Sequence, residues 1–472
     1  MADSRDEMAA EPGSFRDPRG RIYSIGERIF RTVTAEAIDD VRWLTDSGYL
    51  ANLVDQGLLI PTHPVDRDAV SVPGQAAALV EHERIPFVSY PYEWPFSALK
   101  AAALCHLDLH LKLLACDGTL TDASAYNVQF RGSRPVFIDL LSVRRYVNGE
   151  YWLGHRQFVE QFLTPLLLQR LFGIPYNSWY RGALEGIALQ DFARLLSFRQ
   201  WLSWRLALHI LLPARLQSNA RHAAGRAQGL AARVRLPKAR LIGLLTGLTK
   251  WIEQLEPGRG APTPWIRYAD QHSYGGAEVA QKRAFVADFM ARVRPRLVLD
   301  LGCNTGDYSA LALQSGAEMV IGAEADPQTA DVAFRRAVAQ GLNFLPLVVD
   351  AANPSPSHGW RARERTDFVS RAKFDALIAL AFVHHLAIGR NVPLDQLLIW
   401  HVDLAPVGVI EFVPKSDPTV QTMLALREDV FLDYSDASFA SILGRLAHIE
   451  RREVISSSGR TLYWYARMRG SC

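Results

Sequence analysis

Short apolar runs rich in β-branched residues alternate with helical stretches through the second half of the chain. The gaps between successive runs are about 20 to 30 residues, which is typical of βαβ units around a parallel sheet. Two further strand-like runs flank the turn sequence Ser-Ser-Ser-Gly at 456–459 and predict a hairpin that adds an antiparallel edge. The pattern therefore predicts a doubly wound α/β sheet, with strands at residues 296–301, 319–323, 345–349, 374–381 and 408–413 and a hairpin within 451–468.

Helical periodicity dominates the first half of the chain. A long apolar helix is predicted at residues 97–115, with Ser97 as its N-cap. Apolar positions also recur at helical spacing over 195–212 and 236–255. A Pro/Gly cluster at 256–264 indicates a domain boundary. We expect a mostly helical α+β domain that serves in substrate docking, a basic helical linker and the α/β domain, over residues 1–217, 218–262 and 263–472.

The composition is that of a globular protein, because apolar residues make up 49% of the 472 positions and charged residues 21%. No apolar run reaches the roughly 18 residues that a membrane span needs. Residues 1–16 lack the apolar core of a secretory signal. The four cysteines are scattered without CxxC spacing, so neither a disulfide framework nor a zinc cluster is expected. These features favour a cytoplasmic protein with no membrane span.

The distribution of charge suggests a binding partner in one segment only. The net charge of +3 is too small for the whole molecule to bind nucleic acid electrostatically. Residues 192–252, however, contain no Asp or Glu and 11 Arg or Lys. Two helices with solvated faces would explain this bias, and so would a surface for an anionic partner. RNA, a lipid headgroup and an acidic glycan all fit such a surface.

A glycine-rich turn follows the first predicted strand of the α/β domain. Gly302 and Gly306 are four residues apart, so the turn does not fit the GxGxxG fingerprint, and no Walker lysine follows it. Between them Asn304 occupies a position where a left-handed backbone is expected, which asparagine tolerates better than most residues. A turn of this kind lets the backbone approach a ligand closely. A doubly wound domain that binds another nucleotide, or no ligand, would also carry such a turn.

The turn resembles motif I of class I S-adenosylmethionine (AdoMet) methyltransferases, with Asn304 replacing a glycine, and the likeness extends over residues 268–468. It implies a Rossmann-like methyltransferase fold in which Glu324 binds the ribose, Asp350 lies near the adenine and Asp326 caps a helix before Pro327. The cofactor-binding residues that the resemblance implies are Asp300, Gly302, Cys303, Asn304, Gly306, Glu324, Ala325, Asp350, Ala351 and Ala381. The same half also resembles bacterial methyltransferases of the nodulation type.

The end of the fourth strand indicates the kind of acceptor. Residues 380–383 read Leu-Ala-Phe-Val in place of the Asn/Asp-Pro-Pro-Tyr/Phe loop of many amino-group methyltransferases, so an oxygen acceptor is favoured. An oxygen acceptor needs a base, and His384 or His385 can supply it near neutral pH. Adjacent residues are expected to project in different directions, so at most one faces the methyl group, and we favour His384. Helix capping and simple exposure are the structural alternatives.

Acceptor binding is expected from two further groups of residues. One lies in a helical segment at 265–292 that precedes motif I, and the other lies at the end of the fifth strand. Packing of aromatic residues and ion pairing within the loop would explain the same residues, and their spacing is not that of a metal site. The candidates are Tyr268, Tyr274, Lys282, Glu411, Lys415 and Asp417.

The first half resembles the C-terminal lobe of aminoglycoside-kinase-like folds over residues 80–215. Asp122 would orient a hydroxyl, while Asn127 and Asp139 would hold Mg²⁺. Leu120 stands where kinases have a histidine, and no lysine-bearing strand or convincing glycine-rich loop precedes residue 97, with 20–26 the nearest candidate. An Asx turn would explain Asp122 locally. We therefore expect a degenerate kinase-like fold or one recruited for acceptor binding.

Two alternatives to a methyltransferase with this docking domain stay open. The first half is a working ATP-dependent phosphotransferase in one of them, and the chain is a non-catalytic AdoMet-binding scaffold in the other. The methyl acceptor is not identified by the sequence, and a small molecule, a glycan, RNA and protein are all compatible with it.

Overall fold

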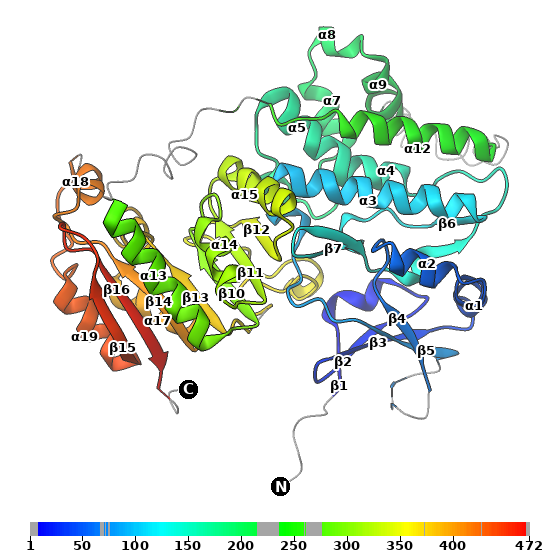
Figure 1. The fold of residues 1–472 in the computed structure, drawn as a ribbon. Coiled ribbons are helices and arrows are strands. Elements are labelled where there is room, and N and C mark those ends of the chain that lie inside the picture. Colours follow the sequence, from blue (N-terminus) through cyan, green and yellow to red (C-terminus); the bar gives the residue numbers. More distant parts are fainter. Residues whose placement is uncertain are drawn as a thin grey trace.

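The structure is a computed structural model that describes residues 8–66, 70, 72–73, 76–214, 236–258, 260, 276–371, 373–425 and 427–468. An α+β region forms the N-terminal half, and a seven-stranded sheet flanked by helices forms the C-terminal half (Figure 1). Within the described residues, no helix is long and apolar enough to cross a membrane.

The C-terminal sheet has the strand order β12-β11-β10-β13-β14-β16-β15. The first five of these strands are parallel, and the β15–β16 hairpin adds the antiparallel edge. This is the expected Rossmann-like methyltransferase fold, so that prediction is confirmed. The strands are β10 (Leu297–Leu301), β11 (Met319–Glu324), β12 (Phe344–Val348), β13 (Ala376–Ala379), β14 (Val407–Phe412), β15 (Ala447–Val454) and β16 (Thr461–Arg467).

Side chains alternate across this sheet and divide its core into two layers. Leu297 and Leu299 of β10 join one apolar cluster, while Val298 between them joins the cluster that contains Phe285 of α13. Helices are packed against these faces, as doubly wound sheets require. They are α13 (Gly276–Val293), α14 (Asp307–Gln314), α15 (Pro327–Gln340), α16 (Val383–Ala387), α17 (Leu394–Leu404), α18 (Pro418–Leu424) and α19 (Asp436–Leu446).

The N-terminal half begins with a five-stranded antiparallel sheet of order β1-β2-β3-β5-β4. Two short helices, α1 (Ile38–Asp46) and α2 (Tyr49–Asp55), separate β3 from β4. Beyond this sheet β6 pairs with β9, and β7 and β8 form a hairpin. The strands are β1 (Met8–Ala10), β2 (Ile22–Ile25), β3 (Arg28–Val33), β4 (Thr62–Val65), β5 (Ala78–His82), β6 (Gly118–Leu120), β7 (Val128–Arg131), β8 (Arg134–Phe137) and β9 (Val143–Arg145).

Helices make up the rest of the N-terminal half, around the long helix α3 (Phe96–Ala115). Lying along α3 is α12 (Lys238–Glu253), which falls within the expected linker and buries Leu241 and Leu245. The remaining helices are α4 (His155–Phe158), α5 (Thr164–Phe172), α6 (Asn177–Gly182), α7 (Leu189–Leu195), α8 (Phe198–Trp201) and α9 (Trp204–Leu206), with π-helical turns at Val159–Leu163 and Ala207–Leu211.

The predicted N-cap of α3 is wrong. Pro95 occupies the N-cap position, and Ser97 is the second residue of the helix. The backbone N–H of Ser97 instead donates to the carboxylate of Asp331 in α15, at 2.6 Å. A side chain from the other half of the molecule therefore satisfies this helix end, which no local pattern around Ser97 could indicate.

Several side-chain contacts join the two halves. On α15, Phe334 meets Phe130 of β7 edge to face, with ring centroids 5.8 Å apart. The segment 351–371, between β12 and β13, carries Arg371, which forms a buried ion pair with Glu93. Because both charged groups are withdrawn from water, this pair ties the segment to the N-terminal half.

Candidate functional site

The turn from β10 into α14 lies at the carboxyl end of the sheet, where open α/β sheets bind their ligands. Gly302 has φ +68°, and a Cβ there would lie 2.9 Å from the ring of Phe382. Gly306 has φ +83° and forms the N-cap of α14. Asn304 has φ +49°, which confirms the left-handed conformation expected for it. Both glycines are required here, because each has a positive φ and a Cβ at either position would press on an aromatic ring, Phe382 at Gly302 and Phe344 at Gly306.

Glu324 ends β11 beside this turn, and its carboxylate is held in a fixed orientation. It accepts hydrogen bonds from the backbone N–H groups of Asn304, at 3.0 Å, and Asp326, at 2.9 Å. Burial raises the pKa of Glu324 to about 7. A carboxylate can accept more bonds than these two, so it keeps capacity for a ligand hydroxyl. Asp326 accepts from Thr329 N–H and so caps α15, as predicted.

Asp300 lies on β10, two residues before the glycine turn. It is buried, and its carboxylate accepts a hydrogen bond from the hydroxyl of Ser309 at 2.6 Å. Burial raises the pKa of Asp300 to about 7. Its side chain links β10 to the first turn of α14 and so fixes the two ends of the glycine turn relative to each other. Neighbouring Cys303 is buried as well.

Two more parallel strands bring expected cofactor residues to the same edge. Asp350 and Ala351 follow β12, and the Asp350 carboxylate accepts from Ala352 N–H and from Arg390. Ala381 follows β13 with φ +49°, a strained conformation for an alanine. Its N–H donates to the carboxylate of Glu411 at 2.8 Å, which holds the strained residue in place.

These residues fit AdoMet. The fixed carboxylate of Glu324 stands beside the glycine turn and can accept bonds from the hydroxyls of a ribose. Ligands of open α/β sheets bind at this edge. Ala325 lies in the same stretch, between Glu324 and the cap of α15.

The two adjacent histidines occupy the first turn of α16, with ring centroids 4.1 Å apart. Their rings are tilted by 39° to each other, with His384 buried and His385 part-exposed, and the expectation that at most one faces the methyl group stays a prediction. His384 is fully buried, and neither ring nitrogen has a hydrogen-bond partner among the described residues. Burial, and then nearby His385, lower its pKa well below the usual value. Burial also lowers the pKa of His385 to about 4.

A buried ionic network lies close to these histidines. Glu411 is fully buried and accepts from the Lys282 ammonium at 2.6 Å, while Arg460 lies 3.4 Å away from it. Arg460 also donates to Asp417 at 2.6 Å. Burial lowers the pKa of Lys282. The network therefore joins α13, β14 and the β16 hairpin beneath the edge of the sheet.

Of the other expected acceptor residues, the structure describes only Lys415. Lys415 is part-exposed and forms an ion pair with Asp429 at 2.8 Å. Tyr268 and Tyr274 lie outside the described residues. The acceptor-binding roles expected for all six candidates stay predictions.

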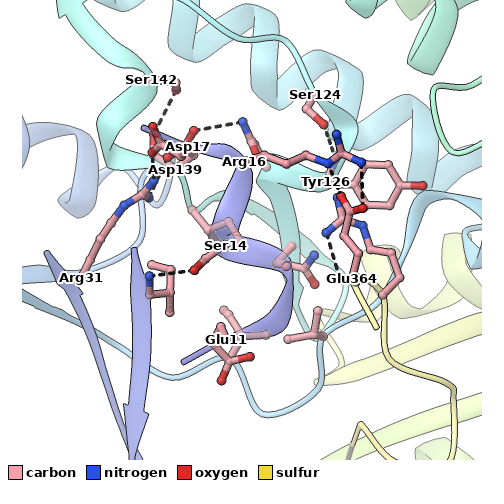
Figure 2. A pocket seen from close by; sticks show the side chains of 18 of the residues that line it. Glu11, Ser14, Arg16, Asp17, Arg31, Ser124, Tyr126, Asp139, Ser142 and Glu364 are labelled. Carbon is pink, nitrogen blue, oxygen red and sulfur yellow. Dashed lines mark hydrogen bonds and ion pairs between the residues drawn. The ribbon is translucent and has the colours of Figure 1, made fainter. Parts of the chain in front are cut away.

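A second site occupies the N-terminal half, where a pocket of about 830 Å³ opens between the five-stranded sheet and the β7–β8 hairpin (Figure 2). It brings together the three residues expected from the kinase-like spacing. The amide of Asn127 donates to Asp122 at 3.3 Å and to Asp139 at 3.2 Å. Burial, and then Asp139, raise the pKa of Asp122. The expected Asx turn is present as well, because Asp122 accepts from Ser124 N–H.

Sequence reasoning missed the cation of this pocket. Arg31, on β3, forms ion pairs with Asp139 at 2.6 Å and with Asp17 at 2.7 Å (Figure 2). A weak signal was available, because Arg31 is a charged residue within the strand-like run Ile-Phe-Arg-Thr-Val at 29–33. Segment 20–26, the nearest glycine-loop candidate, forms β2 and the turn after it.

The C-terminal half completes the wall of this pocket. Glu364 accepts from the Arg16 guanidinium at 2.6 Å, and Arg365 lies over the ring of Tyr126 with its Cζ 4.1 Å from the centroid. Both residues belong to the segment that follows Asp350 and Ala351. No three His, Cys, Asp or Glu side chains gather as a metal site in the part of the chain that the structure describes.

No protein-family model matches the chain. It is 46% identical over 474 residues to nodulation protein NoeA of Rhizobium meliloti (strain 1021), and the match covers 99% of each chain. The likeness thus extends over both halves of the molecule.

Solved structures match parts of the chain at low sequence identity. Magnesium protoporphyrin IX methyltransferase (ChlM) from Synechocystis PCC 6803 is 19% identical, over 47% of this chain and 92% of that one, with a TM-score of 0.30. The N-methyltransferase NodS from Bradyrhizobium japonicum WM9 is 11% identical, over 41% and 97%, with a TM-score of 0.31. The bifunctional kinase-methyltransferase WbdD is 17% identical, over 44% and 43%, with a TM-score of 0.31. At TM-scores this low, none of the three carries weight for the function of this chain.

Proposed function

The chain belongs to the family of nodulation protein NoeA, and within that family we propose that its C-terminal half transfers a methyl group from AdoMet to an acceptor oxygen. The observation that carries the proposal is the Glu324 carboxylate, fixed at the end of β11 beside the glycine turn of β10. A carboxylate at this place in a doubly wound sheet is suited to accept both hydroxyls of a ribose.

The remaining cofactor contacts follow the edge of the sheet. The backbone of the turn at 302–306 would lie against the cofactor, because Gly302 and Gly306 carry no side chain to keep a ligand away. Asp350 and Ala351 would contact the adenine from the end of β12. Ala381 would present its backbone near the methyl group, held there by Glu411.

When bound, AdoMet supplies a methyl group on a positively charged sulfur, which an acceptor oxygen can attack in line. The part of this chain is to align the acceptor and to remove its proton. We propose that a ring nitrogen of His384 takes up the proton of the acceptor, with His385 as the second candidate for this base. His384 is neutral at pH 7 because its pKa is lowered, and a base must be unprotonated to act.

Methyl transfer from labelled AdoMet into a cell extract tests this function. The extract is separated into protein, RNA, lipid, glycan and small-molecule fractions after incubation with the purified full chain. Label in one fraction, at least tenfold weaker with Glu324→Ala at low AdoMet concentration, supports the proposal. Tight AdoMet binding with no label in any fraction would instead identify a non-catalytic AdoMet-binding scaffold.

A second candidate function is favoured by the N-terminal pocket, where we propose a phosphotransferase-like site for ATP and Mg²⁺. Its parts occur in the order known from protein kinases: a strand cation, Arg31, then Asp122, Asn127 and Asp139. Arg31 differs from the kinase lysine but reaches Asp139 from the third strand. The carboxylate of Asp139 and the amide oxygen of Asn127, whose side chains are in contact, are oxygen ligands of the kind Mg²⁺ prefers.

Calorimetric titration of ATP with Mg²⁺ tests the second function on the full chain. Binding that needs Mg²⁺ and is lost in Asp139→Asn supports it. Asp122→Asn serves as the matched variant, because orienting a hydroxyl affects turnover and leaves ATP binding in place. Absence of ATP binding to the wild-type chain contradicts a phosphotransferase and leaves acceptor docking as the role of the pocket.

A further inference from the structure

Large apolar side chains stand exposed together on the outer helices of the N-terminal half. Phe198 is 78% exposed, Leu202 75% and Trp204 67%, although isolated domains normally leave few such residues in water. We call this surface the apolar tip. Its residues are Leu195, Phe198, Leu202, Trp204, Leu208 and Leu212, from the end of α7 through α8, α9 and the following π turn.

The apolar tip is distinct from the hydrophobic core beneath it. Trp204, Leu208 and Leu212 are spaced by four residues and so share one helical face. The intervening Leu206 and Ile210 are buried against the N-terminal core. The segment is therefore apolar on its outer side as well as on its inner side. The buried inner residues hold it against the core, so the exposed outer residues are not needed for that packing.

Charge around the tip restricts what can cover it. Arg194, with a side chain 80% exposed, and Arg199 flank it, and Arg205 lies over the Trp204 ring. The whole stretch at 192–252 contains no acidic residue. Asp191, just outside this stretch, forms an ion pair with Arg194 at 3.4 Å, while Arg199 and Arg205 belong to the stretch without acids. Exposed apolar and aromatic side chains bordered mainly by arginines complement a surface that is apolar inside and anionic at its boundary.

We propose that the apolar tip inserts into the headgroup region of an anionic lipid bilayer and holds the protein at a membrane surface. Phe198, Leu202 and Leu212 would enter the acyl boundary, while Trp204 would take the interfacial position that indole rings favour. In Figure 1, α8 projects from the outer edge of the helical region, away from the seven-stranded sheet, so a flat bilayer can reach it. Of the anionic partners that the sequence leaves open, this selects the lipid headgroup.

Vesicle co-sedimentation of the full chain tests the proposal. Wild-type protein is expected to sediment with phosphatidylcholine vesicles that contain phosphatidylglycerol, more weakly with phosphatidylcholine alone, and less at high salt. Phe198→Ser/Leu202→Ser should weaken the binding by roughly tenfold or more, because both side chains lose their transfer into lipid. Both positions are exposed, so the fold should persist, which circular dichroism and the thermal midpoint check.

The matched control is Leu432→Ser, which removes an 87% exposed leucine from the C-terminal half and should bind vesicles as the wild type does. Arg194→Gln/Arg199→Gln should reduce the preference for anionic vesicles. No sedimentation of the wild-type chain overturns the proposal, as does unchanged sedimentation of Phe198→Ser/Leu202→Ser. Self-association that this variant abolishes, without vesicle binding, also overturns it and makes the tip an interface between copies.

Discussion

Glu324 shows how one side chain combines a structural and a binding role. Its two backbone hydrogen bonds orient the carboxylate, while burial makes it costly to keep charged without a partner. A ribose would supply that partner. The hydrogen bonds from Asn304 and Asp326 also keep the Glu324 side chain from rotating.

Replacing Glu324 by alanine should weaken AdoMet binding and leave the fold intact. Losing hydrogen bonds to a charged acceptor costs about 1.5–3 kcal/mol, or roughly 10- to 150-fold in affinity. Titration calorimetry measures this directly. Asp326→Ala is the control, since it removes the cap of α15, lowers the free energy of unfolding by about 1 kcal/mol and should leave the AdoMet affinity unchanged. An unchanged dissociation constant in folded Glu324→Ala would remove the ribose assignment.

His384→Ala should lower kcat by roughly 10²- to 10⁴-fold on a verified acceptor, with little change in AdoMet affinity. The pH profile carries a second expectation. Because burial lowers the pKa of His384, the base stays unprotonated as pH falls through 6.5, and kcat should decline only well below that value. Steady-state rates between acid and neutral pH test both points. If His384→Ala and His385→Ala each keep wild-type turnover, the histidines are structural.

Individual residues differed in how far the sequence could predict them. Asn304 and Asp326 were predictable because backbone conformation and helix capping depend on a few neighbouring residues. Ser97 was mispredicted because Asp331, distant in sequence, satisfies its N–H. The strained Ala381 had no signal, since the hydrogen bond that holds it comes from another strand.

Among the elements, the parallel strands were the most predictable. Each is buried on both faces and therefore appears as a short apolar run bounded by turn residues. The segment 351–371 between β12 and β13 was not predictable, because it is polar and without periodicity. Its place is determined by contacts with the N-terminal half, such as the hydrogen bond from Thr366 N–H to the Tyr90 hydroxyl.

The contact between α3 and α15 offers a test at the level of elements. Asp331→Ala should lower the free energy of unfolding by about 0.5–2 kcal/mol, the usual contribution of a helix cap, because the N–H of Ser97 loses its acceptor. Urea unfolding measures the change. Arg335→Ala, which removes the exposed partner of the same carboxylate, should cost less than about 1 kcal/mol. Equal effects of the two variants would contradict the capping role.

In the whole molecule, the two halves are joined by buried groups. Arg371 and Glu93 have side chains only 3% and 0% exposed, and Arg371 also donates to the Val88 carbonyl. Segment 351–371 leads from Asp350, at the proposed adenine contact, to Glu364 and Arg365, in the wall of the N-terminal pocket. Occupants of the two sites would therefore touch opposite ends of one segment.

Breaking the buried pair should destabilise the whole chain. Arg371→Met leaves the Glu93 carboxylate buried without its cation and should cost about 3–5 kcal/mol in the free energy of unfolding. Glu93→Gln/Arg371→Met should recover part of this loss, because neither side chain is then charged. Urea unfolding is the measurement, with Arg292→Met as the exposed control at less than about 1 kcal/mol. A loss in Arg371→Met no larger than in this control would show that the pair does not join the halves.

The central claim is that this fold carries out AdoMet-dependent methyl transfer. Its most direct test is the formation of S-adenosylhomocysteine by the purified full chain, measured by mass spectrometry in the presence of fractionated cell extract. We predict acceptor-dependent product with the wild type, and at least tenfold less with Glu324→Ala at low AdoMet concentration. Failure of the folded wild-type chain to bind AdoMet, or to form S-adenosylhomocysteine with any fraction, would contradict the claim.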